Sequence, residues 1–272
     1  MRRKKVGLVL GSGAARGLAH IGIVERLSQE SIPIDVIAGT SMGAAIGAVY
    51  AARGQVSHIA TWFSRQSRQK LASYADLALP RTGFIKGDKI KKRLVSFLGG
   101  DIDFRALRLP FACVATDLDS GEAVILDRGS VADAVRASIS IPGIFTLVEH
   151  EGRYLVDGGL VNPVPVDIAQ QLGAEFIIAV NVIPDMRDFS AREEHQDERH
   201  RHEPNLVQVV MNAVHIGNYS LARASLENAD IIIEPQLAAI GAGEFHHSAE
   251  CIRLGSLAAR AALPEIRKKL NL

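Results

Sequence analysis

The sequence predicts a three-layer α/β/α fold in which helices cover both faces of a mostly parallel central sheet. Short apolar runs alternate with longer stretches of helical periodicity, a pattern typical of parallel strands joined by crossover helices. Neither an internal repeat nor a break in composition divides the 272 residues, and one domain of that length can bury a large core. We therefore expect a single domain over residues 1–272.

The apolar and helical stretches give the expected elements in order. Strands are expected at residues 5–10, 34–38, 111–116, 123–126, 153–156, 176–182 and 230–234, and helices at residues 18–30, 42–52, 131–137, 164–172, 206–227 and 248–270. A polar turn with a glycine at residues 119–122 joins two apolar runs and predicts a hairpin. The sheet is therefore expected to be mixed.

Charge and cysteine content exclude several classes of function. The 31 Lys and Arg residues balance 30 Asp and Glu residues, so no nucleic-acid partner is expected. Cys113 and Cys251 lie in apolar surroundings without CxxC spacing. We expect buried free thiols rather than a disulfide or a zinc site.

The start of the chain imitates a signal peptide, because four basic residues precede an apolar run at residues 6–10. Glycines and then Arg16 and His20 interrupt this run too early, so we expect a first strand. No stretch reaches the roughly 18 apolar residues of a membrane span. The expected location is the cytoplasm, and transient contact with a membrane surface stays open.

Residues 185–204 contain almost no apolar side chains and predict a solvated surface loop. Its histidines, His195, His200 and His202, leave a metal site as a second interpretation. The surface loop is favoured.

Ser41 is the central residue of a GxSxG motif that follows an apolar run and opens an Ala/Gly-rich helix. This strand-to-helix setting is that of a nucleophile elbow, in which Gly39 and Gly43 let the two elements approach. The alternative is a helix start at which Thr40 or Ser41 only caps the first turn. Since only 40 residues precede Ser41, an ordinary α/β-hydrolase, with more strands before its nucleophile, is disfavoured.

A glycine-rich loop follows the first expected strand and leads into a helix. Backbone amides in such a loop bind negative charge, whether a phosphate or a transient oxyanion. The spacing lacks the GxGxxG of a dinucleotide site and the GK[ST] of a P-loop, so an oxyanion hole fits better. The loop begins with Gly11, Ser12, Gly13 and Ala14, and the following Arg16 either braces the loop or lies on the surface.

Asp157 is the strongest candidate for the base, because it directly follows an expected strand and precedes Gly158 and Gly159, which permit close backbone approach. None of the nine histidines lies in a strand-end motif. The alternative is a simple Asp-Gly turn. Ser138 and Ser140 are weaker candidates for the nucleophile, because no base motif accompanies them.

Three blocks thus occur in order: GSGAARGLAHIG from Gly11, GTSMG from Gly39, and DGG from Asp157, the last preceded by ASISIPGIF. Together they resemble the patatin-like phospholipases, in particular small bacterial members similar to the catalytic region of neuropathy target esterase. The resemblance covers a motif-bearing core of about residues 5–170. It implies a patatin-like fold with residues 171–272 as a C-terminal scaffold.

The resemblance implies a serine acyl hydrolase that cleaves carboxylic esters of lipids, either phospholipids or lysophospholipids, through a dyad of Ser41 and Asp157. Amides of residues 11–14 would hold the oxyanion, and an acyl-enzyme would form. No metal ion or other cofactor is implied, and no oligomeric state. Many members carry Gly where this chain has Ala14, so a positive φ at that position would cost about 1 kcal/mol.

Residues 56–99 are rich in apolar and aromatic side chains, which suit either contact with acyl chains or packing of helices on the sheet. These side chains are Trp62, Phe63, Leu71, Tyr74, Leu77, Leu79, Phe84 and Phe97. Two other functions stay open: a non-catalytic member of the family that binds lipid or a partner in regulation, and nucleotide binding by the first loop.

Overall fold

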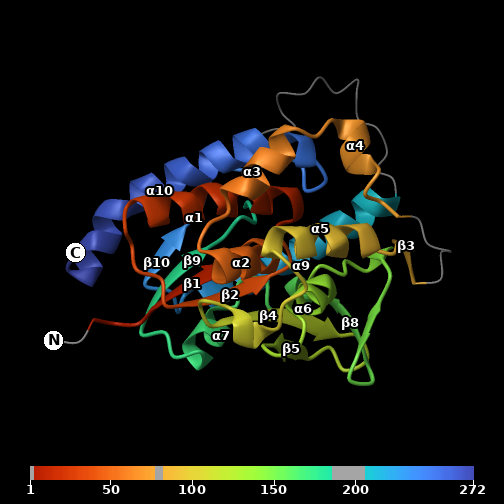
Figure 1. The fold of residues 1–272 in the computed structure, drawn as a ribbon, viewed down its shortest axis with the longest axis horizontal. Coiled ribbons are helices and arrows are strands. Elements are labelled where there is room, and N and C mark those ends of the chain that lie inside the picture. The colour runs from red at the N-terminus through yellow and green to blue at the C-terminus, as the bar shows by residue number, and fades with distance from the viewer. Residues whose placement is uncertain (1–2, 77–81, 186–205) are drawn as a thin grey trace.

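A computed structural model describes residues 3–76, 82–185 and 206–272 as a three-layer α/β/α fold (Figure 1). The main sheet has the strand order β10-β9-β1-β2-β4-β8-β7, and β5 also pairs with β4. Its parallel strands are β1 (Val6–Leu10), β2 (Val36–Thr40), β4 (Phe111–Asp117), β9 (Phe176–Val180) and β10 (Ile231–Ile233). The antiparallel strands are β5 (Ala123–Leu126), β7 (Val148–His150) and β8 (Arg153–Asp157). The predicted mixed, mostly parallel sheet is confirmed.

Helices cover both faces of this sheet. They are α1 (Ala19–Gln29), α2 (Met42–Arg53), α3 (Ser57–Ser64), α4 (Arg68–Ala72), α5 (Asp88–Leu98), α6 (Val131–Ser138), α7 (Val166–Gln171), α9 (Leu206–Leu226) and α10 (Ser248–Leu270). Short 3₁₀ turns occur at Ala14–Leu18, Phe104–Ala106, Gly158–Leu160 and Phe245–His247. All six expected helices are present, with ends that differ by a few residues.

The alternation of side chains along the strands divides the core into two apolar layers. In β1, Leu8 and Leu10 pack with the layer under α1, α2 and α10, whereas Val9 packs with the layer under α7 and α9. In Figure 1, α1 and α10 accordingly lie on one side of the sheet and α7 on the other. Because both faces are covered, the parallel strands are apolar throughout rather than alternating in sequence.

Two strands meet end to end beside β4. Val114 of β4 pairs with Thr40 of β2 on one side and with Ile125 of β5 on the other. The next residue, Ala115, pairs with β5 and with Asp157 of β8, so β8 continues the edge that β2 occupies. Since β2 and β8 run in opposite directions, their carboxyl ends face each other at this point.

The sequence did not reveal three short strands. One is β7, and the others form a separate two-stranded sheet of β3 (Gly83–Ile85) and β6 (Gly143–Phe145). Each has three residues, too few for an alternating pattern to stand out. The described part of residues 56–99 forms α3, α4, β3 and α5. From the sequence, its apolar and aromatic side chains suited either contact with acyl chains or packing of helices on the sheet.

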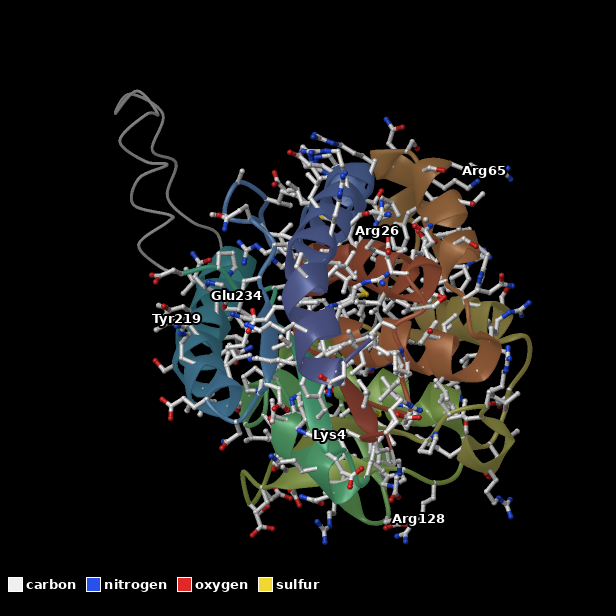
Figure 2. The ribbon with its side chains drawn as sticks, turned by 90° about the vertical axis from the view of Figure 1, so that its left-hand side faces the viewer. Lys4, Arg26, Arg65, Arg128, Tyr219 and Glu234 are labelled. Atoms are coloured by element: carbon white, nitrogen blue, oxygen red, sulfur yellow. The ribbon has the colours of Figure 1, made fainter. Side chains whose placement is uncertain are left out.

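Cys113 and Cys251 are buried free thiols, as predicted. Among the described helices, none has the length and hydropathy to cross a bilayer. The charged side chains of Lys4, Arg65 and Arg128 point into solvent from separate parts of the chain (Figure 2). The loop expected at residues 185–204 lies, apart from Asp185, outside the described residues, as do Leu77 and Leu79.

Candidate active site

The junction of β2 and β8 brings Ser41 and Asp157 together. The Ser41 hydroxyl donates a hydrogen bond to Asp157 Oδ2 over 2.7 Å, although 116 residues separate the two in the chain. Ser41 is 4 % exposed and Asp157 is 3 % exposed. Both line one small cavity, so the pair is accessible to a reacting group yet sheltered from bulk water.

The backbone of Ser41 is strained. Its φ of 55° and ψ of −120° lie outside the regions that residues with a side chain usually adopt, at a cost of about 1–3 kcal/mol. Gly43 makes this turn possible, because a Cβ atom there would lie 2.0 Å from the Leu10 carbonyl oxygen. A Cβ at Gly39 would lie 2.7 Å from the Cα of Ala44. A side chain at either position would therefore collide with neighbouring backbone atoms.

Ser138 supports the serine turn. Its hydroxyl accepts the Ser41 N–H over 2.9 Å and donates to the Val114 carbonyl over 2.6 Å, so both its donor and an acceptor site are used. The Ser140 hydroxyl bonds instead to Arg136. Neither hydroxyl contacts the Asp157 carboxyl group, so neither has the partner that a nucleophile would need.

Asp157 is held in an environment that makes its carboxylate a better base. Burial raises its pKa to about 6, although hydrogen bonds from Ser41 and from the Gly159 N–H (2.7 Å) act in the opposite direction. Gly158 is the first residue of the 3₁₀ turn that also contains Gly159, and it packs against the backbone of Val114. Among the described residues, no histidine bonds to Ser41 or to Asp157. The pair thus has the arrangement of a two-residue nucleophile and base.

The glycine-rich loop offers fewer donors than its sequence suggested. The Gly11 amide donates to the Val180 carbonyl (3.1 Å) and the Ser12 amide donates to the Pro163 carbonyl (2.8 Å). Within the described part of the chain, the amides of Gly13 and Ala14 have no acceptor, and both residues line the cavity with Ser41. These two amides are the ones available to a bound anion.

Ala14 has a φ of 47°. This is the positive φ at which its methyl group was expected to destabilise the fold. Ala14→Gly should raise the free energy of unfolding by about 0.5–1 kcal/mol, because glycine adopts positive φ without a steric penalty. The matched change Ala15→Gly, at a buried neighbour with negative φ, should lower it by a similar amount. Chemical denaturation of both variants tests this, and destabilisation by Ala14→Gly would contradict it.

His20 is a supporting residue that the sequence did not single out. Its Nε2 bonds the Gly11 carbonyl over 2.8 Å, and since a carbonyl only accepts, Nε2 carries the proton. Complete burial lowers the pKa of His20 to about 4, so the ring is neutral at physiological pH. With the Ser12 amide held by Pro163, the Gly11–Ser12 peptide is fixed from both sides. No recurring sequence pattern marks a single histidine in the first turn of α1.

Arg16 braces the loop rather than lying on the surface. It is 5 % exposed, its Nε donates to the Ile240 carbonyl (2.7 Å), and its Nη1 lies 3.4 Å from His215 Nδ1. Burial and the neighbouring guanidinium lower the pKa of His215 to about 4. Arg16, His215 and Asn218 line the cavity with Ser41 and Asp157, so α9 contributes polar side chains that the sequence motifs did not reveal.

A possible set of metal ligands lies outside this cavity. Glu244, His246 and His247 bring one ligand atom each within 4.8 Å of one another. The Arg68 guanidinium approaches His246 Nε2 to 2.6 Å, and the Glu244 carboxylate accepts the Gly241 N–H. Because a cation and a backbone donor already use two of the three ligands, we assign no ion to this cluster. The expectation of no cofactor stays a prediction.

Several relatives resemble this chain over about two thirds of its length. An uncharacterized NTE family protein of Mycobacterium tuberculosis is 37 % identical, over 65 % of this chain and 49 % of its own. Neuropathy target esterase sws of Drosophila melanogaster is 33 % identical over 65 % and 13 % of the two chains, and lysophospholipase nte1 of Aspergillus fumigatus is 35 % identical over 66 % and 12 %. The matched part is thus about half of the mycobacterial relative and a small part of the other two.

A solved structure and a family model extend these comparisons. VipD from Legionella pneumophila has a similar fold, with a TM-score of 0.52 over 97 % of this chain and 67 % of VipD, at 14 % sequence identity. The family model of the patatin-like phospholipases matches residues 8–170, a span that contains the glycine-rich loop, Ser41 and Asp157. Since this match takes in more than half of the chain, the protein belongs to the patatin-like phospholipase family.

Proposed function

We propose that the protein is a serine acyl hydrolase that cleaves the carboxylic ester bonds of phospholipids or lysophospholipids through Ser41 and Asp157. The observation that carries the proposal is the 2.7 Å hydrogen bond from the Ser41 hydroxyl to a buried carboxylate. Gly13 and Ala14 line the same cavity, and their amides have no acceptor among the described residues. A nucleophile bonded to a base whose pKa lies near neutrality is the arrangement that covalent acyl transfer requires.

In the first half of the reaction, the Ser41 oxygen attacks the ester carbonyl carbon while its proton passes to Asp157 Oδ2. The tetrahedral intermediate collapses when the C–O bond to the alcohol breaks, and the alkoxide leaving group takes the proton from Asp157. The acyl group is then esterified to Ser41. The raised pKa of Asp157 suits both directions of proton transfer, because the carboxyl group can accept and return a proton near neutral pH.

In the second half, a water molecule occupies the place of the alcohol. Asp157 takes a proton from this water as its oxygen attacks the acyl carbon, and the Ser41 oxygen leaves and recovers that proton. The products are a fatty acid and the free enzyme. No histidine is needed in either half.

The developing oxyanion would be held by the amides of Gly13 and Ala14. Of the four candidate donors, these two are not already bonded within the described residues. His20 and Arg16 act indirectly, because each bonds to a backbone carbonyl of the surrounding loops. Removing one oxyanion donor typically costs about 10²–10³ in rate, so the precise position of this loop matters as much as the base.

The lipid substrate class rests on the relatives. The family is named for phospholipase activity, and one relative is described as a lysophospholipase. The proposed setting is the cytoplasm, with transient contact at a membrane surface where such lipids reside. Balanced charge gives no preference for anionic lipid over neutral lipid.

Labelling with a fluorophosphonate probe tests the proposal. The probe should modify the wild-type protein, mass spectrometry should place the adduct on the peptide containing Ser41, and Ser41→Ala should not be labelled. Folding of both proteins is checked by circular dichroism. Folded wild-type protein that is not labelled would overturn the enzyme proposal and favour a non-catalytic lipid- or partner-binding role.

A further inference from the structure

A second cavity lies next to the one that contains Ser41, and its lining is almost entirely apolar. It has a volume of about 190 Å³ and is lined by residues of α2, α3, α4 and α5 and by Phe245. Ser41 lines the first cavity and Met42, the following residue, lines the second. The linings of the two cavities therefore approach each other at the start of α2, although no residue lines both.

The second cavity follows α2 away from the nucleophile. Met42, Ala45, Ile46 and Val49 line it, at the spacing of one helix face. From Met42 to Val49 the helix rises about 10 Å. The cavity thus extends along one face of α2 from Met42, the residue next to Ser41.

Buried side chains line the end of this cavity that is distant from Met42. Val49 and Ile59 are both buried, at 0 % and 2 % exposed, and Phe97 of α5 lies beside them in the lining. His58 at the start of α3 bonds the Phe97 carbonyl over 3.1 Å, which ties α3 to the end of α5. A ligand that enters beside Met42 therefore meets packed side chains about two helical turns further on.

Among the described residues that line the cavity, Arg93 is the one with a charge, and neighbouring aromatic rings cover its guanidinium group. Its guanidinium carbon lies 5.1 Å from the centre of the Trp62 ring and 5.7 Å from that of Tyr74. The guanidinium also donates to the Tyr74 hydroxyl over 2.8 Å. The surface that the cavity offers to a ligand is therefore hydrocarbon and aromatic.

We propose that this cavity is the acyl-chain subsite of the hydrolase and holds about eight carbons counted from the ester carbonyl. The proposal rests on the proposed function, because an ester bound at Ser41 has its acyl chain beside Met42. A cavity of about 150 Å³ holds benzene, with six carbons, so 190 Å³ corresponds to roughly eight. The flexible thioether chain of Met42 can turn aside to admit the chain. Carbons beyond the eighth meet Val49 and Ile59 and add no buried contact.

Hydrolysis of p-nitrophenyl esters from acetate to palmitate tests the length limit. Up to octanoate, each added methylene should raise kcat/KM by as much as about four-fold, and longer chains should give no further rise. Ala45→Phe should lower the octanoate-to-acetate ratio of kcat/KM at least ten-fold, because a phenyl ring nearly fills the cavity. Phe97→Ala should move the optimum to longer chains. The exposed matched change Ala72→Phe on α4 should leave the profile unaltered.

A binding measurement tests the acyl-chain subsite independently of ester hydrolysis. Octanoate should bind to Ser41→Ala protein in calorimetry, and adding Ala45→Phe should abolish the binding. Ser41-dependent hydrolysis with an unchanged chain-length profile in folded Ala45→Phe and Phe97→Ala would overturn the subsite alone. A wild-type protein that binds octanoate but hydrolyses no ester would instead overturn the proposed function and, with it, the role of this cavity in catalysis.

Discussion

Replacing Ser41 by alanine is expected to lower kcat for ester hydrolysis by roughly four to six orders of magnitude. The change removes the nucleophile and one of the two hydrogen bonds that the Asp157 carboxylate accepts, and it leaves the amides of Gly13 and Ala14 in place. Those amides and substrate binding would support only a residual rate. Initial rates with p-nitrophenyl octanoate, measured on protein that retains its circular dichroism spectrum, give the comparison. A loss of less than 100-fold would show that another residue attacks the ester.

The matched variant Ser41→Gly separates chemistry from backbone strain. Both variants lack a nucleophile, but only glycine relieves the φ of 55° and ψ of −120° at this position. We expect Ser41→Gly to unfold with a free energy about 1 kcal/mol higher than Ser41→Ala, after allowance for the greater freedom of glycine in the unfolded chain. Equal denaturation midpoints would mean that the turn does not store strain.

The parts of the candidate site that the sequence could indicate depend on local signals. A strand that runs into small residues marks the turn at Ser41. A second strand, followed by the sequence Asp157-Gly158-Gly159, marks the position of the carboxyl group. The sheet and its helices could be predicted because apolar runs and helical periods are also local. The meeting of β2 and β8 beside β4 depends on strand register between segments more than 100 residues apart, which no local pattern encodes.

The parts that were missed depend on such distant contacts. The Gly11 and Ser12 amides are bonded because Val180 and Pro163 happen to lie beside them in space, so a loop sequence alone cannot tell free donors from used ones. Ser138 supports the Ser41 amide across 97 residues, and His20 is one buried histidine with no repeated spacing. Each contact becomes visible only when the tertiary structure is known.

Asp157→Asn is expected to lower kcat by roughly 10³–10⁴-fold while the fold stays intact. An amide can still bond to the Ser41 hydroxyl, but it cannot accept the proton that attack releases. In the wild-type protein, kcat/KM should be half its maximum near pH 6, level off about one pH unit above that and fall about ten-fold per pH unit further below, because protonation of a base whose pKa is about 6 removes its acceptor. The measurement is kcat/KM from pH 4.5 to 9 for both proteins. A wild-type profile that stays flat down to pH 4.5 would contradict a general base whose pKa is raised by burial.

The same variant should be more stable than the wild type near neutral pH. Burial raises the pKa of Asp157 in the folded protein above its unfolded value of 3.8, so the folded state binds the proton more tightly. The contribution of this group to the free energy of unfolding is about 3 kcal/mol at most. It is fully present below about pH 4 and is lost as the pH rises through about 6. Asparagine carries no charge, so it avoids this loss, although its hydrogen bonds to Ser41 and Gly159 are weaker. Denaturant unfolding should therefore show Asp157→Asn gaining stability over the wild type between pH 4 and 6 and keeping the gain at pH 8. A gain that does not depend on pH would show that the buried carboxylate is not its source.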